Sequence, residues 1–155
     1  MKIVIDSNIV FSAILNTQSK IGQLIINGSK YFDFFTVGLL KEEIIAHKDK
    51  ILHFTKFSET QFDDTFQLII SRITFVDDIL LTDKDLNKAI DLVAGIDEND
   101  VLFVALNNHL LATLWSGDKH LINGLKGKGY SRIITTTDLY EIFLYKQLKN
   151  RKKEK

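Results

Sequence analysis

The chain of 155 residues contains no cysteine and no proline, and it carries no net charge. The lack of cysteine excludes disulfide bonds and thiolate chemistry. No apolar run reaches the roughly 20 residues that a membrane-spanning helix needs. The N-terminus also lacks the basic region, apolar run and small-residue cleavage site of a signal peptide. We therefore expect a cytoplasmic protein that does not associate with a membrane.

The length and composition predict one folded domain. A chain of this size can bury a substantial core, and a hydrophobic content of 45% argues against disorder. No linker, repeat or low-complexity segment interrupts the sequence. We expect a single domain over residues 1–148, followed by a basic tail at 149–155.

The charge is unevenly distributed along the chain, because the last ten residues hold six cations and one acid. The cations at Lys149, Arg151, Lys152 and Lys153 are typical of tails that bind nucleic acid. The alternative is a solvated helix end, whose cations are favoured by the helix dipole. Both interpretations stay open at the level of sequence.

Short apolar runs alternate with segments of helical periodicity. The β-branched run Ile3-Val4-Ile5 is typical of a central parallel strand. Further strands are expected at 32–37, 74–76, 111–115 and 132–135. Helices are expected at 9–15, 21–26, 39–52, 58–73, 82–93, 119–125 and 139–148, with one more that holds Asp100 in its first turn. This alternation predicts an α/β fold with a mainly parallel central sheet and helices on both faces, in three α/β/α layers.

Local signals give some of the expected boundaries. Ser7 or Asn8 is expected to cap the first helix, and Thr137 the last. Thr82 and Asp85 form a capping-box pattern. The glycines at 124, 127 and 129 are expected to form a loop.

Acidic residues recur where strands end and helices begin. Asp6 ends the first strand, and Asp118 follows the strand that ends near Trp115. Ligands of open α/β sheets bind outside the carboxyl ends of the strands. Carboxylate oxygens are the ligands that Mg²⁺ prefers, and clustered carboxylates cannot all stay ionised without a cation. Each acid alone could be a helix cap or a partner of a helix dipole, but the set together favours a metal site.

Four motifs carry a resemblance to a known family. They are Asp6-Ser-Asn-Ile-Val, Leu40-Lys-Glu-Glu-Ile, Asp100 with Ala-Leu five residues later, and Ser116-Gly-Asp-Lys-His-Leu. In this order the sequence resembles the PIN-domain nucleases, which include the VapC-type toxins of toxin–antitoxin pairs. The resemblance covers residues 1 to about 145. It implies a PIN-like fold and a metal-dependent endoribonuclease, a hydrolase whose acidic pocket binds Mg²⁺ or Mn²⁺.

The resemblance also assigns residues to the pocket. By position, Asp6, Asp100 and Asp118 match the first, third and fourth acids of the family. Glu43 is favoured as the second over Glu42, because the family places this glutamate directly before an apolar residue.

Three accessory residues are carried over with their alternatives. Asp97 matches an accessory acid, with a helix cap as an equal alternative. Asn8 orients Asp6 or only caps a helix, and Ser116 is placed to hydrogen-bond to the metal site. His120 is expected to be a surface histidine.

The partners implied by the resemblance are an RNA substrate, an antitoxin protein and a second copy of the chain in a homodimer. The main alternative is a catalytically weak or inactive PIN-like module that binds RNA or protein, which the presence of all four acids counts against. A haloacid-dehalogenase-type phosphatase would need aspartate in place of Asn8. The sequence contains no phosphate-binding loop, and no glycine-rich turn follows the first strand.

Overall fold

The computed structural model describes residues 1–155, which form a parallel sheet of five strands in the order β3-β2-β1-β4-β5. The strands are β1 (Lys2–Ile5), β2 (Asp33–Val37), β3 (Thr74–Val76), β4 (Thr113–Trp115) and β5 (Ile133–Ile134). The α-helices are α1 (Ser7–Leu15), α2 (Lys20–Gly28), α3 (Leu39–Ala46), α4 (Lys48–Thr55), α5 (Glu59–Ile70), α6 (Asp83–Val93), α7 (Val101–Leu110), α8 (Lys119–Gly127) and α9 (Thr136–Lys153). Two short 3₁₀ helices are η1 (Asp78–Leu80) and η2 (Glu98–Asp100).

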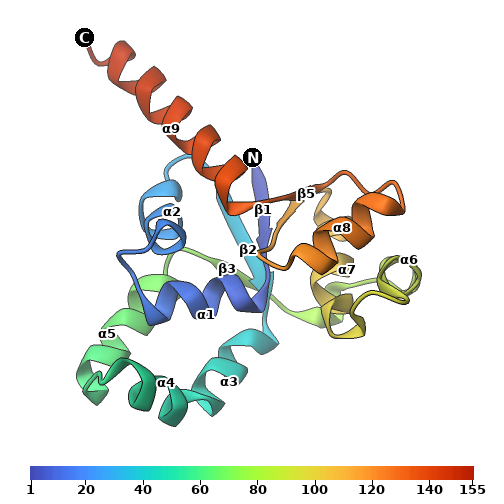
Figure 1. Ribbon diagram of the computed structural model, residues 1–155, viewed down its shortest axis with the longest axis horizontal. Coiled ribbons are helices and arrows are strands. Elements are labelled where there is room, and N and C mark those ends of the chain that lie inside the picture. Colours follow the sequence, from blue (N-terminus) through green and yellow to red (C-terminus); the bar gives the residue numbers. More distant parts are fainter.

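Helices cover both faces of the sheet, which confirms the expected three-layer α/β/α fold. Helices α1, α2 and α5 pack against one another on one side, and α6, α7 and α8 pack on the other (Figure 1). Helix α7 contacts β1, β2 and β4. From β1 the chain adds β2 and then β3 on one side of the sheet, and afterwards returns to add β4 and β5 on the other side of β1. The direction in which strands are added therefore reverses between β1 and β4. Such a switch point is where open α/β sheets bind their ligands.

The core is built on the central strand. Ile3, Val4 and Ile5 are all 0% exposed, as expected for a parallel strand covered on both faces. Trp115 at the end of β4 is also fully buried, and its indole N–H donates to the hydroxyl of Thr136. The pairing of Ile5 with Trp115 places the carboxyl ends of β1 and β4 beside each other.

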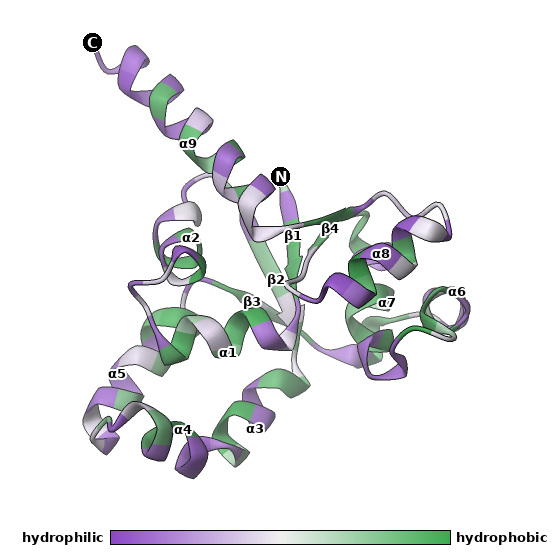
Figure 2. Ribbon diagram, in the orientation of Figure 1, coloured by the Kyte–Doolittle hydropathy of each residue, from purple (hydrophilic) through white to green (hydrophobic).

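Helix α9 is longer than expected and projects from the body of the molecule with the C-terminus at its tip (Figure 1). Its cap is Thr135 rather than Thr137, since the Thr135 hydroxyl accepts from the amide of Asp138. The tip is strongly hydrophilic (Figure 2). Residues 149–153, which were expected to form a tail, belong to this helix. Cations in the last turn of a helix are favoured by its dipole.

Two predicted helices have different boundaries. The helix expected over 39–52 is divided at His47, whose ring nitrogen Nδ1 lies 2.7 Å from the carbonyl oxygen of Glu43. The first helix is capped by Asp6 itself, not by Ser7 or Asn8, because the Asp6 carboxylate accepts from the amide of Ile9. The capping box of Thr82 and Asp85 is confirmed.

Other differences lie around β4 and α8. Leu111 does not belong to the strand: it ends α7 in the left-handed conformation, with φ of 52°, and is 77% exposed. Gly124 and Gly127 lie within α8 rather than in a loop. Gly124 allows close packing, since a Cβ there would come within 2.5 Å of Ile96 Cδ1.

No single helix is long and apolar enough to cross a membrane. Helices α1 and α2 meet the criteria of length and composition only when they are taken together, and they are bent by 99° relative to each other.

Candidate metal centre

Two aspartates lie at the switch point, directly after β1 and β4. One carboxylate oxygen of each caps the following helix. Asp6 Oδ1 accepts from the amide of Ile9 at 3.0 Å. Asp118 Oδ1 accepts from the amides of His120 and Leu121 at 2.9 and 3.2 Å. Capping and ligand binding are therefore not exclusive alternatives here: each cap fixes the carboxylate and leaves its second oxygen for another partner.

Two more aspartates come from the segment before α7. Asp97 caps η2, because its Oδ1 accepts from the amide of Asn99 at 3.0 Å. Asp100 occupies the position before α7, but its side chain makes no capping hydrogen bond. The Asp100 carboxylate is thus not used to complete its own helix.

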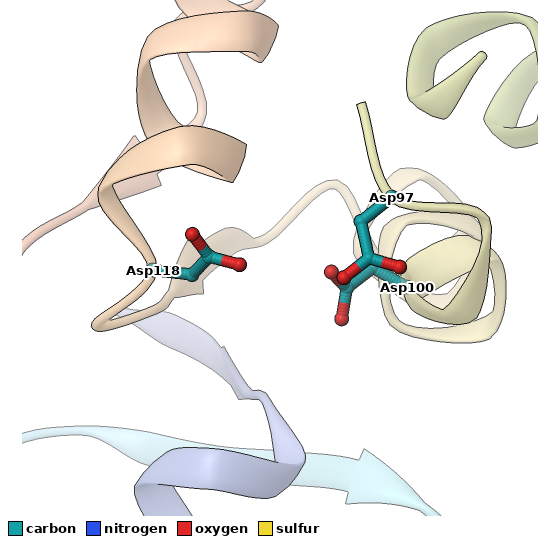
Figure 3. Close-up of side chains that lie close together, drawn as sticks. All are labelled: Asp97, Asp100 and Asp118. Atoms are coloured by element: carbon teal, nitrogen blue, oxygen red, sulfur yellow. The ribbon is translucent and has the colours of Figure 1, made fainter. Parts of the chain in front are cut away.

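These segments bring carboxylates together across the sheet edge. Asp97, Asp100 and Asp118 each offer an oxygen, and these three oxygens lie within 4.8 Å of one another. In Figure 3, Asp118 points across the gap toward Asp97 and Asp100 from the turn before α8. The cluster opens into a cavity of about 410 Å³, which is lined by Asp6, Ser7, Asn8, Glu43, Asp97, Asn99, Asp100, Phe103 and Asp118.

Ser116 supports the cluster from behind. It is fully buried, and its hydroxyl oxygen accepts from the amide of Asp118 at 3.1 Å. The Ser116 hydroxyl also stabilises the charged form of the Asp6 carboxylate, which lowers the pKa of Asp6. Ser116 therefore acts on both of the aspartates that follow neighbouring strands, without lining the cavity itself.

The like charges perturb proton binding. Burial raises the pKa of Asp6 above its usual range, against hydrogen bonds from Ser116 and the Ile9 amide that lower it. Burial also raises the pKa of Asp100 to about 7, and the negative charge of Asp97 adds to this effect. Asp6 and Asp118 contribute further repulsion at Asp100. Each shift reflects a carboxylate that loses solvent and gains anionic neighbours.

The donor set fits a hard divalent cation. Every charged ligand atom in the cluster is a carboxylate oxygen, and the cavity has room for water beside them. Mg²⁺ and Mn²⁺ favour such ligands, and Mg²⁺ usually keeps several waters. A cation would also relieve the repulsion that raises the pKa of Asp100.

The structure brings all four acids of the sequence pattern to one cavity, with different exposure. Asp6 is 2% exposed and lies at the base, whereas Glu43 is exposed on α3. The adjacent Glu42 lines a different cavity. Asp97 belongs to the closest cluster, although the sequence ranks it only as accessory.

The remaining candidates differ in their placement. Asn8 lines the cavity and does not cap α1, and its backbone amide contributes to lowering the pKa of Asp6. His120 is exposed and does not line the cavity, as expected. The cations of the tail are exposed on the last turns of α9 and lie outside the cavity lining; they are Lys149, Arg151, Lys152 and Lys153.

Sequence reasoning did not single out Ser7, Asn99 and Phe103 as lining residues. Phe103 follows Asp100 by three residues, so helical spacing would have placed it on the same face. Ser7 and Asn99 had no signal beyond their position next to a named acid.

Comparison with known proteins agrees with this geometry. The family model described as PIN domain matches residues 4–140. Among curated proteins, no sequence matches the chain. A similar solved structure is the crystal structure of VapBC2 from Rickettsia felis bound to a DNA fragment from their promoter. That match has a TM-score of 0.59 and 17% sequence identity, and covers 87% of this chain and 97% of the other.

The family match spans most of the sequence, and the chain therefore belongs to the PIN-domain family. PIN domains are generally nucleases, which are hydrolases. The likeness to the Rickettsia structure shows a shared fold.

Proposed function

We propose that this protein is an endoribonuclease that uses Mg²⁺ or Mn²⁺ to hydrolyse phosphodiester bonds in RNA. The observation that carries the proposal is the convergence of Asp97, Asp100 and Asp118 within 4.8 Å at the switch point of a PIN-family sheet. Asp6 and Glu43 complete the acidic cavity. An arrangement with so much uncompensated negative charge destabilises the folded chain unless a cation binds it.

The residues of the chain have separable roles in this proposal. Asp100 and Asp118 hold the cation together with Asp97 or Asp6. Glu43, which is exposed and also lines the cavity, adds a further carboxylate to the site. The capping bonds to α1 and α8, and the hydrogen bond from the Asp118 amide to the Ser116 hydroxyl, keep the carboxylates oriented before the cation binds. A bound divalent cation supplies a water of lowered pKa and neutralises charge on the phosphoryl oxygens.

The acidic cavity itself repels an anionic substrate, so affinity for RNA must come from elsewhere. We assign part of it to the exposed cations of α9, namely Lys149, Arg151, Lys152 and Lys153. Deleting residues 149–155 should weaken RNA binding and flatten its salt dependence, since the slope follows the number of neutralised phosphates. Turnover at saturating RNA should change little. An unchanged slope would assign these cations to a solvated helix end.

We also propose that the protein is the toxin of a toxin–antitoxin pair. The support is the family and the fold shared with the VapBC2 structure, which is described as bound to promoter DNA. The test is to co-express the product of the neighbouring open reading frame. A cognate antitoxin should copurify with the protein and suppress its ribonuclease activity, and a neighbour that does neither would contradict this proposal.

The main experiment measures cleavage of single-stranded RNA with Mn²⁺, with Mg²⁺ and with EDTA. We expect cleavage with either metal and none with EDTA. The competing function is an inactive PIN-like module, which would bind RNA equally in EDTA and cleave it in no condition. Electrophoretic analysis of the products and fluorescence anisotropy of the same labelled RNA separate the two.

A further inference from the structure

A second cavity lies beside the acidic cavity, at the same edge of the sheet. It has a volume of about 390 Å³ and forms where β2 and β3 end, next to the start of α3. Its lining residues are Gly38, Leu39, Lys41, Glu42, Phe75, Asp77 and Asp78. Since all five strands are parallel, these residues share the carboxyl edge with Asp6 and Asp118.

Helix α3 contributes residues to the lining of both cavities. Glu43 lines the acidic cavity and Glu42 lines the second one. Adjacent helical residues point about 100° apart, so a helix of this kind can face two cavities at once. Two adjacent residues of α3 thus line the two cavities, as is needed for one nucleic-acid strand to occupy both.

The second cavity contains an aromatic ring. Phe75 is half-buried, and the ammonium of Lys41 lies 4.8 Å from its ring centroid. A lysine over a phenylalanine is not by itself a site, as Lys48 lies 5.5 Å from the centroid of Phe62, which is only 2% exposed. Phe75 differs because it lines an open cavity. Bases stack on such rings, since every base has a π-face.

The charges of the second cavity disfavour a phosphate and favour a base. Three acidic residues, Glu42, Asp77 and Asp78, line this cavity together with a single cationic one, Lys41. Asp77 Oδ1 accepts from the amide of Ile79 at 3.1 Å, which leaves its second oxygen for another donor. Carboxylates accept hydrogen bonds only, and guanine presents two adjacent N–H donor groups on its Watson–Crick edge.

We propose that this second cavity is a base-binding subsite that selects a guanine beside the cleaved phosphodiester. In it Phe75 stacks on the base and Asp77 accepts from the donor edge through the carboxylate oxygen that does not cap η1. Lys41 leaves the ring and turns toward a flanking phosphate, as its flexible stem allows. The proposal rests on the proposed ribonuclease function, and names the specificity of that site.

The first test compares cleavage of short single-stranded RNAs that differ only at the nucleotides flanking one bond. Wild type should prefer guanine at one flanking position. Asp77→Asn keeps the size of the side chain and its capping oxygen but adds an N–H donor, so the preference for guanine over adenine should fall about tenfold. Phe75→Leu should lower kcat/KM about tenfold for every base at that position. Lys48→Gln is the matched control and should change neither value.

The second test needs no cleavage and no metal. Guanosine 5′-monophosphate, uridine 5′-monophosphate and inorganic phosphate are each titrated into the ¹⁵N-labelled protein in EDTA. Guanosine monophosphate should shift the amide signals of Gly38, Phe75 and Asp77, and the other two compounds should not. Absence of these shifts, or an unchanged base preference in Asp77→Asn, would overturn the subsite. If the shifts occur in a protein that cleaves no RNA, the subsite stands and the proposed function fails.

Discussion

Two groups of polar side chains lie at the two ends of α7. The members of one group hydrogen-bond to each other, and the members of the other repel each other. In its last turn, Asn107 donates to Tyr130 Oη at 2.7 Å, and Tyr130 Oη donates to Asn108 Oδ1 at 2.9 Å. Arg132 donates to the same Asn108 oxygen at 2.7 Å. Just before its first turn, Asp100 faces Asp97, with no cationic side chain lining the cavity.

The difference separates polar groups that hold the fold from polar groups that serve a ligand. The amide network is closed within the protein, apart from the two atoms Asn107 Oδ1 and Asn108 Nδ2, which have no partner. Satisfied buried polar groups stabilise a fold, because their hydrogen bonds replace those to water. The acids instead repel one another, and burial together with this repulsion raises the pKa of Asp100 to about 7. Mutations in the first group should therefore lower the stability of the fold, and mutations in the second group should lower the activity.

The largest effect is expected for the acid that follows β4. Asp118→Asn should lower kcat for RNA cleavage by about 100-fold or more, since lost metal or transition-state contacts typically have effects of this size. Asparagine can still cap α8 through its oxygen, so the fold and RNA binding should remain. Kinetics with Mn²⁺ measure the effect. Glu98→Gln is the control, because Glu98 is exposed in η2 and outside the cavity lining. Retention of more than about a tenth of wild-type turnover would argue against a direct role.

At the other end of α7, Asn107→Ala should reduce the free energy of unfolding by about 2 kcal/mol. The side chain is fully buried and also donates to the carbonyl of Arg132 at 3.0 Å. Urea denaturation in EDTA and in Mn²⁺ checks the prediction. The metal-induced gain in stability should equal that of wild type, and a reduced gain would show that the two ends of α7 are coupled.

A smaller difference is expected between the adjacent glutamates of α3. Glu43→Gln should lower kcat about tenfold with little change in KM, because only Glu43 lines the acidic cavity. Glu42→Gln should leave kcat within about twofold and change KM or the preference for the neighbouring base. Steady-state kinetics on one RNA substrate compare them. Equal losses of kcat, or a larger loss for Glu42→Gln, would contradict the assignment of Glu43.

The contrast also explains what sequence alone could predict. The convergence of Asp6, Asp100 and Asp118 followed from strand ends and helix starts, because a parallel sheet brings these points to one edge. The close approach of Asp97 did not follow, since a capping aspartate has the same local sequence whether or not it faces other acids. The network of Asn107, Asn108, Tyr130 and Arg132 was missed, because its members are separated by up to 25 residues and none belongs to a motif.

Some helix boundaries could not be predicted from the sequence either. At the break, the ring nitrogen Nδ1 of His47 lies 2.7 Å from the carbonyl oxygen of Glu43. Gly124 was expected in a loop, but it belongs to α8 at the point where Ile96 packs against that helix. In each case a tertiary or side-chain contact overrode a local signal.

The smallest expected effect is the change in melting temperature caused by Asp100→Asn in the metal-free protein. Its sign distinguishes a metal ligand from a partner of the helix dipole. Two unit charges about 5 Å apart repel by roughly 3 kcal/mol at an effective dielectric near 20, before screening and proton uptake reduce this. Asp100→Asn removes one charge from the cluster. In EDTA at pH 8 it should leave the melting temperature unchanged or raise it slightly. A helix-dipole role for Asp100 predicts the opposite, a modest loss of stability that does not depend on metal.

The dependence of this effect on pH follows from the raised pKa of Asp100. Because the folded state holds the proton up to about pH 7 while an unfolded aspartate releases it near 3.8, the folded state binds more protons between these values. Stability of the wild type in EDTA should therefore fall as pH rises from about 4 to 7. The raised pKa of Asp6 acts in the same direction. Asp100→Asn should flatten this slope, whereas Glu98→Gln should not.

Added Mn²⁺ should reverse the trend in wild type, since the cation binds the deprotonated carboxylates and stabilises the folded state by mass action. The gain in melting temperature should then grow with pH, and should be smaller in Asp100→Asn. Thermal melts of wild type, Asp100→Asn and Glu98→Gln at pH 5 and pH 8, in EDTA and in Mn²⁺, measure both the pH dependence of stability and the gain from the metal. If Asp100→Asn melts lower than wild type in EDTA and keeps the full gain from Mn²⁺, Asp100 belongs to the structural class of polar groups, like the amides at the other end of α7.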